Sequence, residues 1–408
     1  MTKRITPLLI AVMLLTQMPA YAAASTSSAI TTTLSAVSAG TSVAAINVVS
    51  GGALTYDDAV TQALGYSKDV QMKAITIGQS RDLRDRMANL VVNAGYTSDS
   101  MGSSVLNGPN GMSYVPDSTE KQALLGVTQA QNALIVNNSM YSVAQDSVAF
   151  AVWAAFDQIE SLQNQITSET ENIKVLADKL SLGHTESNLG LKSDFDLTSQ
   201  MKDLDTEKKN LELLNKSLTA AYSTLNSLLG KPDGSRYILQ REVKYEEMAK
   251  NTDISGMVLS KKSGDPYIQT LRQSLKNAEA SLNMFTLSGG ADKSYSERKD
   301  DVSIAGKTID QANLSYDLVF RNRVSQLMQL QDQIKQDQIK LAKAQDTLKL
   351  VNTQVSAGLA IATDQEAAQL GVDSTNSDLA NLYIKHATLK KTIDKPYLSP
   401  TYMQSSSS

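Results

Sequence analysis

The chain of 408 residues contains no cysteine and only two histidines, His184 and His386. The lack of cysteine excludes a disulfide framework, thiolate zinc sites, cysteine-ligated iron–sulfur clusters and a lipid anchor on cysteine. Two histidines cannot form a three-histidine metal site. We therefore expect the protein to work without a metal or another cofactor.

Aromatic residues and proline are also scarce. Aromatics make up 5% of the chain, and only 8 prolines occur in it. The apolar content comes mostly from Ala, Leu, Val, Ile and Met, which is typical of long helices, whereas β-rich folds favour aromatic and β-branched residues. The formal net charge is −4, so no basic field is available to bind nucleic acid.

Residues 1–22 have the pattern of an export signal. Lys3 and Arg4 form a charged start, residues 8–15 are apolar, and Ala20-Tyr21-Ala22 is a small-x-small cleavage site. The alternative is a membrane anchor, but the apolar run falls short of the ~20 residues that span a bilayer. We expect cleavage near Ala23, which leaves a net charge of −6 once the two basic residues are removed.

The remaining terminal segments have loop compositions. Residues 23–52 are rich in Ala, Ser, Thr, Val and Gly and carry no charge, and we interpret them as a linker. Residues 396–408 contain two prolines and end in four serines, which predicts a flexible tail.

The strongest signal is a seven-residue spacing of apolar side chains in four runs, typical of helices that pack along a seam. The runs are 152–180, 197–225, 327–355 and 372–393; in the second, every position is leucine (Leu197, Leu204, Leu211, Leu218 and Leu225). Two of the helices, about 139–182 and 313–357, would be roughly 65 Å long at ~1.5 Å per residue. We therefore predict an elongated fold dominated by α-helices.

The runs form two pairs, which indicates a duplicated structural unit. Gly190-Leu191 precedes Asp196 as Gly358-Leu359 precedes Asp364, a shift of 168 residues, and the upstream runs match with a shift of 175. We assign the difference of one heptad to a loop around Gly183. The predicted organisation is a first repeat at 53–232, a connector at 233–249 and a second repeat at 250–395.

Each repeat is expected to contain a tip between two helices. The first tip, about 93–138, begins rich in Gly, Ser, Asn and Pro, and the second, about 288–306, is shorter and highly charged. Membrane strands need about 9–11 residues with alternating polarity. The second tip cannot supply two such strands and the first shows little alternation, so the expected β-hairpin tips are reduced or absent.

Three stretches resemble the TolC family of outer-membrane efflux proteins. The stretches are ALTYDDAVTQAL at 53–64, LNSLLGKP at 225–232 and AGLAIATD at 357–364. The resemblance covers about residues 53–395. It implies helical hairpins of the TolC-like α-barrel type in a homotrimer, acting as a passive exit duct of an efflux or type I secretion assembly in the outer membrane or cell envelope.

The same resemblance implies partners and site residues. An inner-membrane pump would supply energy, and a membrane-fusion adaptor would contact the helical tip at Gly190, Leu191, Gly358 and Leu359. Asp364, and with it Asp196, would lie where the tunnel narrows. The tyrosine and arginine contacts that can hold the family's tip shut have no counterpart, because those positions carry Val355 and Ala360.

Other interpretations of these residues remain open. Asp196 and Asp364 could be N-caps of the returning helices. His386 falls on a heptad core position and is expected to be a packed polar residue, and Trp153 a packing anchor. His184 is expected in a loop. Gly306-Lys307-Thr308 is similar to the end of a phosphate loop but lacks the first glycine of that motif, and no other catalytic motif is present. We therefore expect no enzyme. The alternative function is a secreted coiled-coil structural protein of the cell envelope without channel activity.

Overall fold

The computed structural model describes residues 50–93, 106–107, 113–114, 118–249, 251–285 and 293–398. The predicted signal peptide lies outside the described residues. So do most of the predicted linker, most of the predicted tail, and residues 94–105, 108–112, 115–117 and 286–292, which include parts of the two predicted tips.

Two very long helices run the length of the molecule. Helix α3 (Ser118–Asn188) has 71 residues and helix α7 (Tyr295–Ser356) has 62. At about 1.5 Å per residue they measure about 105 and 93 Å. The shorter helices are α1 (Tyr56–Tyr66), α2 (Lys68–Asn93), α4 (Asp194–Leu229), α5 (Ile254–Ser263), α6 (Pro266–Asn283) and α8 (Ala362–Asp394). The prediction of an elongated, helix-dominated fold is confirmed.

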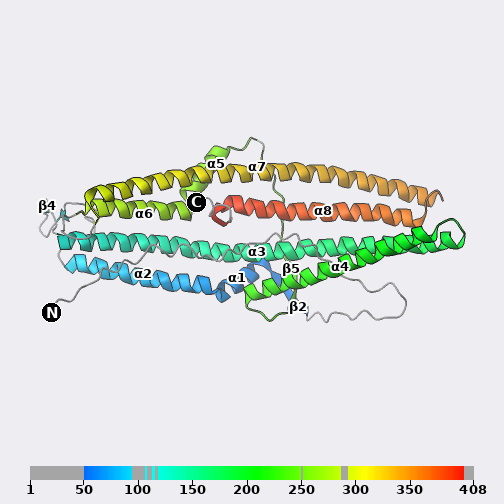
Figure 1. The fold of residues 1–408 in the computed structure, drawn as a ribbon, viewed down its shortest axis with the longest axis horizontal. Coiled ribbons are helices and arrows are strands. Elements are labelled where there is room, and N and C mark those ends of the chain that lie inside the picture. Colours follow the sequence, from blue (N-terminus) through cyan, green and yellow to red (C-terminus); the bar gives the residue numbers. More distant parts are fainter. Residues whose placement is uncertain are drawn as a thin grey trace.

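The helices lie side by side in an elongated bundle (Figure 1). Helix α3 contacts α2 and α4 on one side and α6 and α8 on the other, and α7 packs on α6 and α8. Because α6 and α8 follow one another along the same row, they together match the length of α7 (Figure 1). The two helical hairpins α3/α4 and α7/α8 therefore share one body and turn back at the same end of it.

The element order of the first half recurs in the second. A short helix, a medium helix, a very long helix and a returning helix occur as α1 to α4 and again as α5 to α8. Each half also has its own apolar cluster in the middle of the body. The first is centred on Phe156, Ile159 and Leu225, and the second on Tyr316, Phe320 and Leu327.

Strands are few and short among the described residues. Strand β2 (Ser50–Thr55) pairs in parallel with β5 (Arg236–Gln240), and β3 (Leu106–Asn107) pairs antiparallel with β4 (Ser113–Tyr114). Strand β2 begins inside the predicted linker, and β5 lies in the predicted connector. The pairing therefore fastens the start of the first repeat to its end.

The beginning of the predicted tail is ordered. Residues Pro396–Leu398 form a short 3-10 helix, η3. The hydroxyl of Tyr397 donates to Oδ2 of Asp146 at 2.5 Å, and the carbonyl oxygen of Pro396 accepts from Nη1 of Arg323 at 3.2 Å. These contacts dock the end of α8 on α3 and α7.

Three boundaries differ from the sequence-based expectation. Helix α3 begins at Ser118, inside the predicted first tip, and α7 begins at Tyr295, inside the predicted second tip. Gly183 and His184 lie within α3 and not in a loop. Gly183 serves helix packing, because a Cβ there would lie 2.6 Å from Oε1 of Gln200 on α4. The glycine thus marks a close approach of two helices.

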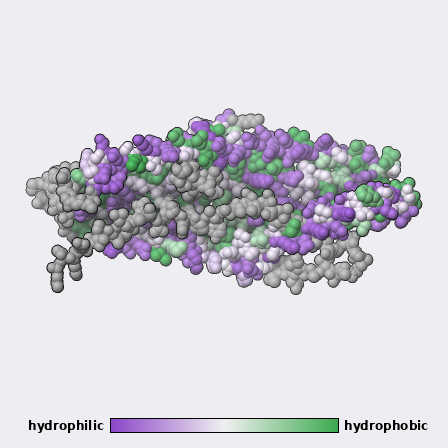
Figure 2. Space-filling view, in the orientation of Figure 1, coloured by the Kyte–Doolittle hydropathy of each residue, from purple (hydrophilic) through white to green (hydrophobic). Residues whose placement is uncertain are grey.

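The heptad positions form buried seams. Leu204 is 6% exposed and Leu211 is fully buried, and both pack against Ile173 of α3. Leu218 is half-buried against the first apolar cluster. The predicted register of α4 is therefore confirmed. Outside the seams, hydrophilic side chains cover much of the face seen in Figure 2.

Candidate functional site

The first candidate region is the turn between α3 and α4. Gly190 has a φ of +74°, in the left-handed region that favours glycine. The Leu191 N–H donates to the carbonyl of Glu186 at 2.8 Å, and the Gly190 N–H donates to the carbonyl of Ser187 at 2.9 Å. This pair of bonds is a Schellman motif, which satisfies carbonyl groups left open at a helix end.

The turn between α7 and α8 repeats this geometry. Gly358 also has a φ of +74°. The Leu359 N–H donates to the carbonyl of Gln354 at 2.8 Å, and the Gly358 N–H donates to the carbonyl of Val355 at 3.0 Å. Both turns lie at the same end of the molecule (Figure 1). The four residues Gly190, Leu191, Gly358 and Leu359 are thus two copies of one helix-ending device.

Large apolar side chains stand exposed on both turns. Leu191 is 76% exposed and Leu359 is 80% exposed. Phe195, which the sequence analysis did not single out, is 81% exposed in the first turn of α4. Hydrophobic residues are visible at this end in Figure 2. Exposed apolar groups gathered at one place typically mark a contact surface. A phenylalanine between Asp194 and Asp196 is the signal that could have identified it.

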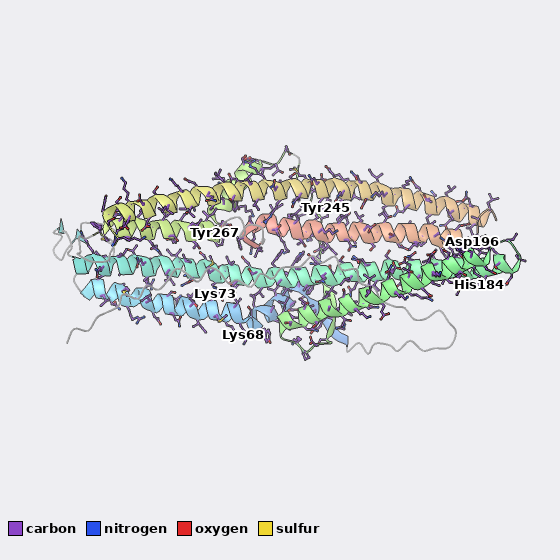
Figure 3. All side chains as sticks on the ribbon, in the orientation of Figure 1. Lys68, Lys73, His184, Asp196, Tyr245 and Tyr267 are labelled. Atoms are coloured by element: carbon purple, nitrogen blue, oxygen red, sulfur yellow. The ribbon has the colours of Figure 1, made fainter. Side chains whose placement is uncertain are left out.

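Asp196 lies beside the first turn but is not the N-cap of α4. The cap is Ser193, whose Oγ accepts from the backbone N–H of Asp196 at 3.1 Å. The Ser193 hydroxyl in turn donates to Oδ2 of Asp196 at 2.7 Å. Asp196 is therefore the third residue of the helix, and its exposed carboxylate lies near the tip in Figure 3.

Asp364 occupies the same place in α8. The N-cap is Ile361, which has no side-chain acceptor, and its backbone N–H donates to Oδ2 of Asp364 at 3.1 Å. A carboxylate in the first turn is also favoured by the positive end of the helix dipole. Both aspartates thus stabilise the start of a returning helix from its third position while one side of each carboxylate stays exposed to solvent.

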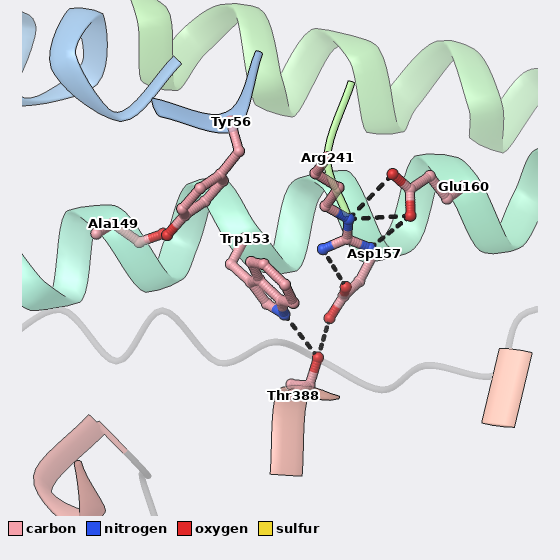
Figure 4. A network of polar contacts seen from close by, with 7 residues as sticks. All are labelled: Tyr56, Ala149, Trp153, Asp157, Glu160, Arg241 and Thr388. Carbon is pink, nitrogen blue, oxygen red and sulfur yellow. Dashed lines mark hydrogen bonds and ion pairs between the residues drawn. The ribbon is translucent and has the colours of Figure 1, made fainter. Parts of the chain in front are cut away.

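A second region, in the middle of the body, is a buried polar network (Figure 4). The Arg241 side chain is only 2% exposed and pairs with Asp157 at 2.6 Å and with Glu160 at 2.5 Å. The Thr388 hydroxyl donates to Asp157 and accepts from Nε1 of Trp153, the latter at 2.8 Å. The network joins α3, the connector and α8, and so links the two repeats.

The charges of this network are held in a poorly solvated place. Burial raises the pKa of Asp157 to about 6, and the nearby Arg241 guanidinium opposes that shift. The Lys391 ammonium lies 4.0 Å from the centre of the Trp153 ring, and burial lowers its pKa. Tyr56 packs edge-on against the same ring. Trp153 is therefore the packing anchor that was predicted, whereas Arg241 and Thr388 were missed.

The remaining predicted residues have structural places. His386 is fully buried and its Nε2 lies 3.2 Å from Nε2 of Gln331, which confirms it as a packed polar residue. In the described part of the chain, no group of three or more His, Asp or Glu residues could hold a metal ion. None of the described helices has an apolar stretch long enough to cross a membrane.

Comparisons with known proteins give matches by structure alone. No protein-family model matches the sequence, and no curated protein sequence matches it. The match to the outer-membrane channel OprN covers 84% of this chain and 91% of the OprN chain, at 13% sequence identity and a TM-score of 0.58. The outer membrane protein VceC of Vibrio cholerae matches 83% over 96% of its own, at 13% identity and 0.55.

A third match extends the same likeness. The CmeC outer membrane channel of Campylobacter jejuni matches 86% of this chain over 89% of its own, at 11% identity and a TM-score of 0.54. The chain therefore has the elongated helical fold of outer-membrane channel proteins, over most of its length and most of theirs. This is the TolC-like fold, and the resemblance predicted from the sequence is confirmed as a likeness of fold.

Proposed function

We propose that this chain is a passive exit duct in the outer membrane or cell envelope, part of an efflux or type I secretion assembly. The observation that carries the proposal is the fold shared with outer-membrane channels over 84% of the chain and 91% of the OprN channel. The duct moves nothing by itself, so an inner-membrane pump supplies the energy.

The duct is proposed to be a homotrimer, and its two turns are proposed to contact a membrane-fusion adaptor. Gly190 and Gly358 hold the chain in its left-handed bend, and Leu191 and Leu359 project 76% and 80% of their surface into solvent. An adaptor that covers these two leucines would gain a binding free energy of about 25 cal/mol for each Å² of apolar surface removed from water. Phe195 belongs to the same surface.

The proposed constriction is built by Asp364, together with Asp196. Both carboxylates lie in the first turn of the returning helices, at the end where both hairpins turn. In a trimer, a ring of three Asp364 carboxylates would favour the passage of cations. Helix stabilisation and ion selection can coexist, because a carboxylate offers more lone pairs than the single backbone N–H uses.

Single-channel recording of the reconstituted protein tests the proposal. The wild type should conduct with a preference for cations, and Asp364→Asn should lower that preference because asparagine keeps the hydrogen bond but lacks the charge. Asp233→Asn is the matched control, because Asp233 lies in the turn after α4, at the opposite end of that helix from the tip.

Two results would count against the proposal. An Asp364→Asn channel with unchanged selectivity would remove this residue from the constriction. A wild type that forms no channel, together with fractionation away from the outer membrane, would favour the alternative of a secreted coiled-coil structural protein.

A further inference from the structure

A buried histidine interrupts the seam between α7 and α8. His386 is fully buried, and Gln331 of α7 is 3% exposed beside it. Among the described residues, Nδ1 of His386 has no hydrogen-bond partner. The seam therefore contains a titratable ring with one ring nitrogen left unsatisfied.

The equivalent place in the first hairpin is apolar. The shifts of 175 and 168 residues that relate the two repeats place Phe156 opposite Gln331 and Leu218 opposite His386. Phe156 is fully buried, and Leu218 packs against the cluster that contains it. One copy of the seam thus closes with two hydrocarbon side chains, and the other closes with an amide and an imidazole.

A segment of the connector covers this place. Residues 241–248, here called the strap, pass beside α8, and Tyr245 is labelled near α8 in Figure 3. In the strap, Arg241, Val243, Tyr245 and Met248 are less exposed than the residues between them. The Tyr245 ring centre lies 4.9 Å from that of His386 and 5.2 Å from that of Tyr383. The Tyr245 hydroxyl is buried and has no hydrogen-bond partner within the described residues. The strap therefore closes the site without satisfying its polar atoms.

Most of the charged groups around the ring are already paired or are positive. On the strap, Glu246 pairs with Lys390 of α8 and Glu247 pairs with Lys335 of α7. On α3, Asp157 and Glu160 are bound by Arg241. The remaining neighbours are Asp332 of α7, which acts electrostatically on Tyr245, and the ring of Tyr383. Burial, and next to it the charge of Lys390, lowers the pKa of His386.

We propose that the α7/α8 seam is an acid-sensitive joint, in which proton uptake by His386 loosens α8 from α7 and from the strap while the α3/α4 seam stays closed. A neutral imidazole needs one hydrogen-bond acceptor, whereas an imidazolium needs two and carries a charge. Among the described residues, no carboxylate makes a hydrogen bond to the His386 ring. This inference goes beyond the proposed function and does not depend on it, because a duct can conduct without a titratable seam.

The sign of the effect follows from proton linkage. The folded seam holds His386 with a pKa below the ordinary value of about 6.5, so the opened seam takes up the proton first as the pH falls. Between these two pKa values, each unit of acidification increases the open population about tenfold. At neutral pH neither state is protonated and the seam stays closed.

Hydrogen exchange of the full-length protein tests the proposal. The rate for a peptide covering residues 379–390 of α8 is divided by that for the matched peptide 211–222 of α4, at pH 7.5 and at pH 5.0. The proposal predicts that this ratio rises at least about threefold on acidification in the wild type, given the tenfold dependence per unit. In His386→Leu, which introduces the residue of the first hairpin, the ratio should rise less than in the wild type.

A direct titration of His386 in the wild type guards against a misfolded His386→Leu protein. Nitrogen-15 resonances of the two histidines report their titration directly, and His184→Asn removes one signal for assignment. A His386 imidazole that titrates well below about 6.5 supports the proposal. A His386 that titrates at the ordinary value, a wild-type ratio that is the same at both pH values, or an acid effect that is equally large in His386→Leu would each overturn it.

Discussion

The two hairpins, α3/α4 and α7/α8, share a backbone and differ in chemistry. Each ends in a Schellman turn on a glycine with a φ of +74°, followed by an exposed leucine and an aspartate at the third position of the returning helix. The side chains between the turns diverge. The seam of the first is closed by Phe156 and Leu218, and that of the second by Gln331 and His386. Duplication has kept the geometry and allowed the packing chemistry to change.

The strap shows the same divergence in its ion pairs. At one end, Arg241 pairs with Glu160 of α3, and at the other, Glu247 pairs with Lys335 of α7. Glu160 and Lys335 are equivalent positions in the two long helices, separated by the shift of 175 residues. The charges are reversed, so the strap holds the same place on both repeats with opposite signs. The Arg241 side chain is 2% exposed and Glu160 is 23% exposed, whereas both members of the Glu247 pair are about two-fifths exposed.

The largest effect should come from the buried end of the strap. Arg241→Met leaves Asp157 and Glu160 without their partner in a poorly solvated place, and removing one member of a buried ion pair costs about 3–5 kcal/mol. Urea denaturation followed by circular dichroism would measure it. Lys335→Met is the control at the exposed end and should shift the midpoint far less. Equal shifts for both variants would show that burial does not distinguish the two ends.

The next largest effect concerns the apolar seam of the first hairpin. Leu211→Ala should lower the free energy of unfolding by about 2–5 kcal/mol, because the side chain is fully buried and the cavity can collapse only in part. Leu213→Ala is the matched control on the same helix, since Leu213 is 43% exposed. A cost below about 0.5 kcal/mol for Leu211→Ala would contradict the register, because substitutions at exposed sites usually stay within that range.

Substitutions at the N-caps of α4 and α8 should change the stability by a smaller amount, and in opposite directions. Ser193→Ala removes the hydroxyl that caps α4 and should cost about 1 kcal/mol. Ile361→Ser supplies the missing hydroxyl to α8 and should stabilise it by a similar amount, since Ile361 already has the extended backbone of an N-cap. Thermal denaturation of both variants checks this. A loss of stability in Ile361→Ser would mean that the isoleucine side chain matters more than the cap.

The smallest effect is a pH dependence of opposite sign in the two hairpins. Burial, and the hydrogen bond that protonated Glu169 of α3 donates to the carboxylate of Glu207 on α4, raise the pKa of Glu169 to about 7. Because this folded-state pKa lies above the unfolded value, the pair stabilises the fold in acid, and that contribution is lost as the pH rises through 7. His386 acts in the other direction. Glu169 is partly solvated, and His386 acts only on the α7/α8 seam. The net change in the stability of the whole protein with pH is therefore small.

Glu169→Gln isolates the first contribution. The amide keeps a hydrogen bond to Glu207 at every pH, so the variant should lose less stability than the wild type between pH 6 and pH 8. Urea midpoints at the two pH values give the answer. The control is Glu171→Gln, because Glu171 is exposed on the same helix. An identical slope in wild type and Glu169→Gln would rule out the carboxyl pair as its source.

Local patterns predicted the parts of the molecule that depend on neighbours in sequence. The spacing of Leu204 and Leu211 gave the buried face of α4, and Gly190 and Gly358 gave the two turns. The start of α3 was placed too late, because residues near Leu124 and Leu134 are buried there without the leucine spacing of the later heptads. The preceding residues are rich in Gly, Ser and Pro, and for that reason the predicted tip extended too far toward the C-terminus.

The central network could not be predicted in this way. Asp157 and Thr388 are 231 residues apart in sequence, and Arg241 reaches them from a segment with no regular periodicity. Only the packing of α8 on α3 brings these groups together. Likewise, the aspartates at the tips were recognised as helix-start residues, but their position three residues into the helix depends on which residue becomes the N-cap, Ser193 or Ile361.

Chemical modification of a thiol at the proposed constriction shows directly whether position 364 lines the path of the ions. The chain has no cysteine, so Asp364→Cys introduces a single thiol and Asp233→Cys provides a matched control. A bulky, negatively charged thiol reagent added during single-channel recording should reduce the current stepwise in Asp364→Cys and leave Asp233→Cys unchanged. If the labelled Asp364→Cys protein conducts as before, or if the unmodified wild type opens no channel, the account of this chain as a duct narrowed at Asp364 is wrong.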